Sequence, residues 1–153
     1  MRVATQTSLQ IRQRQSTDDR FIGRLAAQAF AEYDGQPTVT VQRLVQRGTT
    51  WVAWRGGTPV GFATVHPLPS GSVDLCAIAV DEDARGLGVG RALLAHVELA
   101  VVRAGLSEIN LHTAQSNVAA LELFLKCGFR VVRRMPRFYR GMYDACALSK
   151  RVG

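Results

Sequence analysis

Eleven residues, 84–94, constrain the fold more than any other part of the chain. They read ARGLGVGRALL, follow an apolar run at residues 75–80, and lead into a helical repeat of apolar side chains. A chain that enters a helix presents the unpaired first N–H groups of that helix and the positive end of its dipole. Glycines let an anion approach these backbone groups closely. The segment therefore predicts a strand, an anion-binding turn and a helix in succession.

The spacing of the glycines excludes two common nucleotide-binding turns. A P-loop needs a Lys followed by Ser or Thr after its last glycine, whereas this turn continues with Arg91 and an Ala. A dinucleotide-binding turn needs G-x-G-x-x-G and an acidic residue at the end of the next strand. Here Gly86, Gly88 and Gly90 alternate with other residues, and residues 109–112 carry no acid. The anion is therefore expected to be neither a nucleoside triphosphate nor a dinucleotide.

The pattern that remains, Arg85-x-x-Gly88-x-Gly90, resembles the acyl-CoA pyrophosphate loop of the GNAT superfamily of N-acetyltransferases. A second segment adds to the resemblance. Residues 116–129 (SNVAALELFLKCGF) are similar to the family's S-N-x-x-A-x-x-F/Y-Y/L-x-x-x-G-F segment and follow at the expected distance. Because both motifs stand in the family's order, the chain resembles a GNAT domain.

The end of the chain carries a finer resemblance. Residues 133–139 (RRMPRFY), followed by Asp144 and Ala145, resemble the ending of the branch that acetylates protein N-termini, including the ribosomal-protein alanine acetyltransferases. Together the likeness spans residues 9–150 of 153. This is the size of one domain, so we expect a single N-acetyltransferase domain over residues 1–153.

The resemblance implies an α/β (α+β) fold, a GNAT-like mixed and largely antiparallel central sheet flanked by helices on both faces. Apolar and alternating runs favour strands, and helical repeats bounded by capping residues favour helices. A break at residues 34–37 is expected to line the substrate mouth. The expected strands are residues 9–12, 51–54, 60–66, 73–80, 108–114, 130–134 and 143–148. The first expected helix begins at capping residues 16–19 and ends at about residue 33, and the other three are residues 39–47, 89–104 and 118–127.

Composition excludes several other classes of protein. No apolar run approaches the roughly 20 residues that cross a bilayer, and residues 1–16 contain Arg2, Arg12 and Arg14 without the apolar core of a signal peptide. We therefore expect a cytoplasmic protein without membrane contact. The three cysteines lack C-x-x-C spacing, so neither a disulfide framework nor a metal site is expected. The net charge is +7, and part of it comes from arginines near the end of the chain. These arginines match no nucleic-acid-binding motif, so nucleic acid binding is not expected.

The resemblance also implies how acetyl-CoA is held. In the family the strand before the glycine turn diverges from the strand after the next helix, and the pantetheine arm pairs with backbone in the gap, much as in β-augmentation. A buried strand that binds no ligand would have the same sequence pattern. Asn117 is similar to the residue that reaches this arm and is also a helix N-cap, while Phe124 packs either on the cofactor or in the core. The implied cofactor-binding residues are Ile78, Ala79, Val80, Arg85, Gly86, Leu87, Gly88, Val89, Gly90, Arg91, Asn117 and Phe124.

Acetylation of an amine requires a neutral nitrogen, and acceptors differ in the fraction of the amine that is neutral at pH 7. An α-amine with a pKa of about 7.8 is roughly a tenth neutral at pH 7, whereas lysine, near 10.4, is neutral about once in 2,000. The candidate bases are His112, Asp74 and, less favoured, His66. His112 occupies the position where the N-terminal branch often has a glutamate base, and histidine's pKa near 6.5 suits the role. Asp74 either acts through water or is a solvent-facing strand carboxylate.

The departing CoA thiolate must gain a proton. Tyr139 resembles the family tyrosine that points at the cofactor sulfur, and a phenol of pKa about 10 can share a proton with a thiol near 8.5. Tyr143 is the alternative if the hairpin register differs, and either ring could serve packing alone. Strand alternation places Asp74 on the same face as Cys76 and Ile78. No covalent intermediate is expected, because no cysteine has a His-plus-acid arrangement in the sequence.

The expected function is that of an acetyl-CoA-dependent N-acetyltransferase that transfers the acetyl group directly to a primary amine. A protein N-terminus or lysine is favoured as acceptor. The alternatives are a small-molecule amine as acceptor, or a non-catalytic acyl-CoA-binding sensor. The expected partners are acetyl-CoA and the acceptor, with a homodimer as a further possibility because dimers are frequent in the family.

Overall fold

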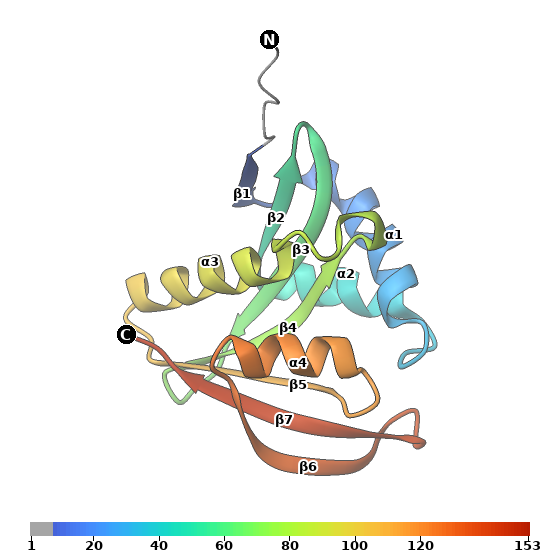
Figure 1. Ribbon diagram of the computed structural model, residues 1–153, viewed down its shortest axis with the longest axis vertical. Coiled ribbons are helices and arrows are strands. Elements are labelled where there is room, and N and C mark those ends of the chain that lie inside the picture. Colours follow the sequence, from blue (N-terminus) through green and yellow to red (C-terminus); the bar gives the residue numbers. More distant parts are fainter. Residues whose placement is uncertain (1–7) are drawn as a thin grey trace.

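The computed structural model describes residues 8–153 and contains one seven-stranded sheet (Figure 1). The strand order is β1-β2-β3-β4-β5-β7-β6. All neighbouring strands run antiparallel except β4 and β5, which run parallel. Residues 1–7, with Arg2 and the start of the segment in which no signal peptide is expected, lie outside the described residues. Within residues 8–153, no helix combines the length and the apolar character needed to span a bilayer.

The elements follow the predicted order along the chain. The strands are β1 (Leu9–Gln13), β2 (Thr49–Arg55), β3 (Thr58–Pro67), β4 (Ser72–Val80), β5 (Glu108–Ala114), β6 (Arg130–Tyr139) and β7 (Tyr143–Arg151). The helices are α1 (Asp19–Phe30), α2 (Pro37–Arg47), α3 (Val89–Arg103) and α4 (Val118–Lys126), with short 3₁₀ turns η1 (Ser16–Asp18) and η2 (Glu82–Ala84).

Several boundaries differ from the prediction by two residues or more, and three of these differences have a clear physical reason. α1 ends at Phe30, because the N–H groups of Tyr33 and Asp34 both donate to the Phe30 carbonyl and close the helix in a turn. α2 begins at Pro37, whose fixed φ suits the first helical position. β6 continues to Tyr139 because an irregular stretch near its end lets it stay paired with β7.

Helices cover both faces of the sheet, each over its own core (Figure 1). The core under α1 and α2 includes Ile22, Val52 and Phe62, each no more than 1% exposed. The core under α3 and α4 includes Leu93 and Ile109, also no more than 1% exposed. Burying each of these side chains stabilises the fold by about 1.5–3 kcal/mol. The sheet is therefore the middle of three layers, as the family resemblance implies.

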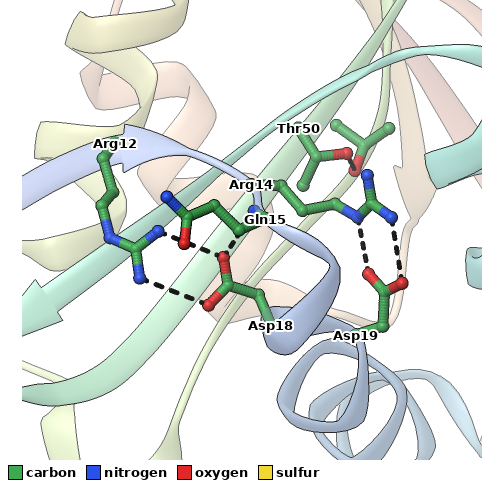
Figure 2. Close-up of polar contacts among 7 residues, drawn as sticks. Arg12, Arg14, Gln15, Asp18, Asp19 and Thr50 are labelled. Carbon is green, nitrogen blue, oxygen red and sulfur yellow. Dashed lines mark hydrogen bonds and ion pairs between the residues drawn. The ribbon is translucent and has the colours of Figure 1, made fainter.

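Two ion pairs join the start of α1 to the end of β1 (Figure 2). The guanidinium of Arg14 donates to both carboxylate oxygens of Asp19, with 2.9 Å between Nη2 and Oδ2. The buried carboxylate of Asp18 accepts the backbone N–H of Gln15 at 2.8 Å and lies 3.5 Å from the guanidinium of Arg12. Asp18 is the N-cap residue of α1 but makes no side-chain cap bond to it, because its carboxylate is turned back to Gln15 at the start of η1.

A bulge in β4 changes the face to which its side chains point. Leu75 and Ala77 pair with adjacent residues of β3, so Cys76 lies between them as an extra residue. Leu75 accordingly belongs to the core under α3, and Ala77 to the core under α1. The prediction that Asp74, Cys76 and Ile78 share one face is therefore wrong for Ile78, which packs against the α3 core. The extra residue reverses the alternation that the prediction assumed.

Candidate active site

A split in the sheet between β4 and β5 forms the centre of the site. The parallel register joins residues 72–74 of β4 only to residues 108–110 of β5. Beyond it, β4 continues against β3 and β5 continues against β7. The backbone of β4 over residues 75–80 therefore borders a gap on its β5 side. This is the divergence of strands that the family resemblance implies.

The glycine turn lies at the far end of this split, where β4 leads into α3. Gly86 and Gly88 have φ angles of +77° and +82°, in the left-handed region that favours glycine. Gly88 is the N-cap of α3, and a glycine brings no side chain to accept the first N–H groups of the helix. Those N–H groups and the positive helix end are available to an anion. Arg85 and Leu87, in the same turn, are exposed.

The last residues of the turn serve packing as well. A Cβ at Gly90 would lie 2.9 Å from Cδ2 of Leu123, so a glycine there lets α3 approach α4 closely. The Val89 side chain is 1% exposed and belongs to the core, which leaves only its backbone to a ligand. The Arg91 side chain is exposed on the first turn of α3.

Two cavities lie beside this end of the split. A cavity of about 540 Å³ between α1 and the turn has Arg24 and Arg85 in its lining, but also three carboxylates, which disfavour a phosphate there. A cavity of about 200 Å³ beside α3 and α4 has three cationic side chains in its lining, Arg91, Lys126 and Lys150, and one carboxylate, Glu98, which pairs with Lys150. The second cavity suits an anionic group better. The carboxylates of the first are Asp81, Glu82 and Asp83.

The remaining cofactor-binding candidates lie on β4, at the start of α4 and, for Phe124, within α4. Ile78 and Val80 are partly buried against the α3 core, and Ala79 is 7% exposed in the core under α1, so all three border the split with their backbone. The side chain of Asn117 accepts the N–H of Ala120 at 3.3 Å and caps α4.

Phe124 lies in the core rather than on an open surface. It is 4% exposed, and its ring centroid lies 5.8 Å from that of Phe129. This placement favours the packing interpretation of Phe124 over a contact with the cofactor.

Five aromatic rings gather beside the split, and we name them the aromatic cluster. They are Tyr33 after α1, His112 on β5, Phe138 and Tyr139 on β6, and Tyr143 on β7. The Tyr33 ring lies 5.5 Å from that of Tyr139 and 5.2 Å from that of Tyr143, between centroids. The His112 ring lies 4.7 Å from that of Phe138 and 6.2 Å from that of Tyr139. The two candidate catalytic residues His112 and Tyr139 are thus brought together.

The aromatic cluster lies on the α1 and α2 side of the sheet. Ile109 and Leu111 of β5 are buried in the core under α3, and strand alternation turns His112 to the opposite face. Tyr33 approaches the same face from the turn between α1 and α2. The glycine turn leads into α3, which covers the other face. The split therefore connects an anion-binding turn on one side of the sheet with aromatic and titratable groups on the other.

Tyr33 and Ser116 are site residues that the sequence analysis missed. The Tyr33 hydroxyl and Ser116 Oγ lie 2.9 Å apart, 83 positions apart in the chain. This bond joins the turn after α1 to the turn before α4. The available signal was the predicted substrate mouth at residues 34–37, which directly follows Tyr33, but no motif spacing singles out the tyrosine.

Tyr139 and His112 have the protonation states that acid and base roles need. Burial raises the pKa of Tyr139 to about 12, with further contributions from Tyr33 and the Asp74 carboxylate, so the phenol keeps its proton at neutral pH. The His112 side chain keeps an exposed edge, but burial of the rest of the ring lowers its pKa, against an opposing effect of Asp74. The imidazole is therefore neutral at pH 7 and can accept a proton.

Asp74 acts electrostatically on both of these groups and also on Cys76. The Cys76 thiol lies 3.4 Å from the Asp74 backbone oxygen and 3.5 Å from its Oδ2. Burial, followed by the Asp74 charge, raises the pKa of Cys76 to about 12. A thiol held protonated in this way is a poor nucleophile, which agrees with the expectation of direct transfer.

His66, the less favoured base, is engaged elsewhere. It pairs with Asp74 across β3 and β4, but its Nδ1 lies 3.2 Å from the carbonyl oxygen of Arg47 at the end of α2. Within residues 8–153, no group of three or more His, Cys, Asp or Glu side chains is arranged to hold a metal ion.

Comparison with known proteins identifies the family of this split-sheet fold. The model of the acetyltransferase (GNAT) family matches residues 13–129. The chain belongs to the GNAT acetyltransferase family. Acetyl-CoA is the acyl donor that this family uses.

Its relatives differ in the acceptors for which they are named. The chain is 34% identical over 128 residues to N-alpha-acetyltransferase RimI of Mycobacterium tuberculosis, covering 80% of this chain and 79% of that protein. It is 32% identical over 134 residues to mycothiol acetyltransferase of Geodermatophilus obscurus, covering 76% of this chain and 42% of that protein. The GNAT chain thus spans about two fifths of the length of this second relative.

A solved structure agrees with the fold. The ribosomal-protein-S18-alanine N-acetyltransferase from Escherichia coli superposes with a TM-score of 0.83, at 23% identity, over 95% of each chain. At this identity the likeness concerns the fold alone.

Proposed function

We propose that this GNAT chain transfers the acetyl group of acetyl-CoA directly to a primary amine, with a protein N-terminus as the favoured acceptor. The observation that carries the proposal is the meeting of a neutral imidazole and a protonated phenol, His112 and Tyr139, beside the split. One group can accept a proton and the other can donate one, and both act without a metal ion or a covalent enzyme intermediate.

The donor is held on the α3 side. Backbone of β4 along the split pairs with the pantetheine arm, and the N–H groups that follow Gly88 bind the pyrophosphate. Arg85 and Arg91 are exposed on the turn and on α3, where their charge favours the same anion. Bound this way, acetyl-CoA supplies a thioester carbon at the aromatic cluster.

The acceptor reacts on the opposite side. His112 takes the proton that the amine must lose, and Asp74 beside it stabilises the resulting imidazolium. The nitrogen forms the new bond to the carbonyl carbon, and the carbon–sulfur bond breaks. Tyr139 gives its proton to the departing thiolate and is restored from solvent. General acid and base groups of this kind each contribute about 10²- to 10⁴-fold to the rate.

The strength of the base favours an α-amine over lysine. An imidazole with a lowered pKa is a weak base. It suffices for an α-amine, whose pKa of about 7.8 already leaves a useful neutral fraction, but is poorly matched to lysine near 10.4. The 34% identity to an N-alpha-acetyltransferase supports the same choice. The relatives named mycothiol acetyltransferase favour a second candidate, an amine of a small molecule.

The test compares acceptors in one assay of CoA release. The probes are a lysine-free peptide with a free N-terminus, a peptide of similar sequence with a blocked N-terminus and one lysine, and a panel of small amines. We expect the first to react at least about tenfold faster than the second, which follows from the difference in neutral fraction.

Other outcomes would replace the proposal. Turnover on small amines alone would move the assignment to the second candidate. Tight acetyl-CoA binding without turnover on any probe would favour an acyl-CoA sensor. A homodimer and a cytoplasmic location stay predictions, to be examined by light scattering and by fractionation.

A further inference from the structure

The hairpin that carries Tyr139 contains a large irregularity. Met135 of β6 pairs with Ala145 of β7, and Tyr139 pairs with Tyr143. Between these pairs β6 has three residues, 136–138, whereas β7 has only Asp144. Extra residues of this kind re-aim the side chains that follow them. The orientation of Tyr139 therefore depends on how the three residues are held.

Asp144 holds them through its side chain. Its Oδ1 accepts the backbone N–H of Arg137 at 3.0 Å, and its Oδ2 accepts from Nη2 of Arg134 at 3.1 Å. Arg137 has a φ of +51°, a conformation that L side chains rarely adopt, so an outside contact is needed to keep it. The Arg137 N–H and the Arg134 guanidinium lower the pKa of Asp144, which therefore accepts both bonds as a carboxylate.

The same residue connects the hairpin to the rest of the site. The backbone oxygen of Asp144 accepts the N–H of Gln115 at 2.9 Å, and the Gln115 side chain accepts from Nε of Arg134 at 3.1 Å. Gln115 directly precedes Ser116, whose hydroxyl meets Tyr33. The bulge is thus fixed to the turn that also holds the aromatic cluster. Phe138 and Tyr139, which follow Arg137, are the rings that this fixing turns toward His112.

We propose that Asp144 is a positioning residue for acetyl transfer: by holding the bulge at residues 136–138, it places the Tyr139 hydroxyl where the departing thiolate must be protonated. The proposal rests on the proposed function, because it assigns Asp144 a role through the acid Tyr139. Asp144 is the first residue of the Asp144-Ala145 pair that the sequence analysis noted after residues 133–139. The fold alone does not explain why an aspartate stands there.

A double-mutant cycle tests whether Asp144 acts through Tyr139. We expect Asp144→Ala to lower kcat about 10- to 100-fold and to leave KM for acetyl-CoA within about twofold, because the donor side is separate. In a Tyr139→Phe background, the same change should cause no further loss of kcat. Asp144→Asn retains an acceptor for the Arg137 N–H and should recover most of the activity. Arg134→Ala, which breaks the ion pair and the bond to Gln115 but leaves the Arg137 N–H bonded to Asp144, should resemble the Asn variant.

Failure of the inference and failure of the proposed function give different results. Equal losses from Asp144→Ala in both backgrounds would overturn the positioning role and leave a merely structural one. Full turnover by Tyr139→Phe would instead overturn the acid assignment on which the role rests. The probe is the peptide with a free N-terminus or, failing that, whichever small amine reacts.

A measurement without turnover provides the second readout. The chain has only three tyrosines, so Tyr139 can be assigned in a ¹³Cζ-tyrosine NMR spectrum by comparison with Tyr139→Phe. In the wild type Tyr139 should stay protonated beyond the ordinary phenol pKa of about 10. In Asp144→Ala it should titrate near that value, although Tyr33, His112 and Asp74 still face it. An unchanged titration would refute the positioning of Tyr139 by Asp144.

Discussion

The two sides of the split sheet are built in opposite ways. On the α3 side, one continuous segment from β4 through the glycine turn offers mainly backbone N–H groups. This segment is recognised by the positions of its glycines, which have no side chains. On the α1 side, the aromatic cluster brings side chains from the turn after α1 and from β5, β6 and β7 to one place. The side that we propose for the donor is thus formed by one local segment, while the side that we propose for the acceptor is assembled from separate parts of the chain. Variants on each side should accordingly affect different kinetic constants.

The largest expected effect is loss of donor binding. Gly88→Glu places a carboxylate at the N-cap of α3, in the turn that we propose binds the pyrophosphate. Like charges forced together cost several kcal/mol, so we expect acetyl-CoA affinity, measured by calorimetry, to fall about a thousandfold, or about 4 kcal/mol.

A matched control exists for this variant. Gly57, in the turn between β2 and β3, has a φ of +80° and open space at its Cβ, as Gly88 has at +82°. Gly57→Glu therefore introduces the same charge and similar backbone strain away from the split, and should bind acetyl-CoA normally. Equal weakening in both variants would mean that strain, not the phosphate turn, explains the loss.

Next comes the acid on the acceptor side. Tyr139→Phe removes the proton donor but keeps the ring, so we expect kcat to fall about 100-fold with little change in acetyl-CoA affinity. Tyr143→Phe, in the same hairpin and also against Tyr33, should stay within about threefold of wild type. If Tyr143→Phe is the damaging change, the alternative hairpin assignment is correct. Steady-state kinetics on the reactive peptide decides between them.

The pH dependence should reveal the base by a smaller effect. Because burial lowers the pKa of His112, its neutral form persists below the ordinary value of about 6.5, and kcat/KM should fall only at lower pH. Stability follows the same group. The unfolded imidazole binds protons near pH 6.5 and the folded one only below it, so stability declines as pH falls from about 6.5. His112→Gln should remove the slope of kcat/KM and should reduce the slope of stability, to which His96 also contributes because burial lowers its pKa too. A slope of kcat/KM that persists would assign the base to Asp74.

The smallest effect concerns the bond between the turns. Ser116→Ala and Tyr33→Phe each remove the same exposed hydrogen bond, which contributes about 0.5–1.5 kcal/mol. Each should raise the acceptor KM about two- to tenfold without changing acetyl-CoA affinity. The two single variants and the double variant should behave alike, because only one bond is lost. A larger effect of Tyr33→Phe alone would give the phenol a further role.

The contrast between the two sides also explains what the sequence could predict. The glycine turn, the strand at residues 108–114 and the N-cap Asn117 depend on local rules, and the structure has them where the sequence placed them. Tyr33 joins the aromatic cluster only through the tertiary fold, so no spacing announced it. The bulge at Cys76 was also missed, because an extra residue in a strand leaves no trace in an alternating pattern.

The short parallel register between β4 and β5 has a mechanical consequence. Only three residue pairs connect the antiparallel group β1–β4 to the antiparallel group β5–β7 across the sheet. That seam is the shortest register in the sheet, and a donor held as we propose would lie along it and contact both groups. Amide hydrogen exchange should therefore differ between the two groups in the free protein and converge when acetyl-CoA is bound, so that the domain opens as one cooperative unit.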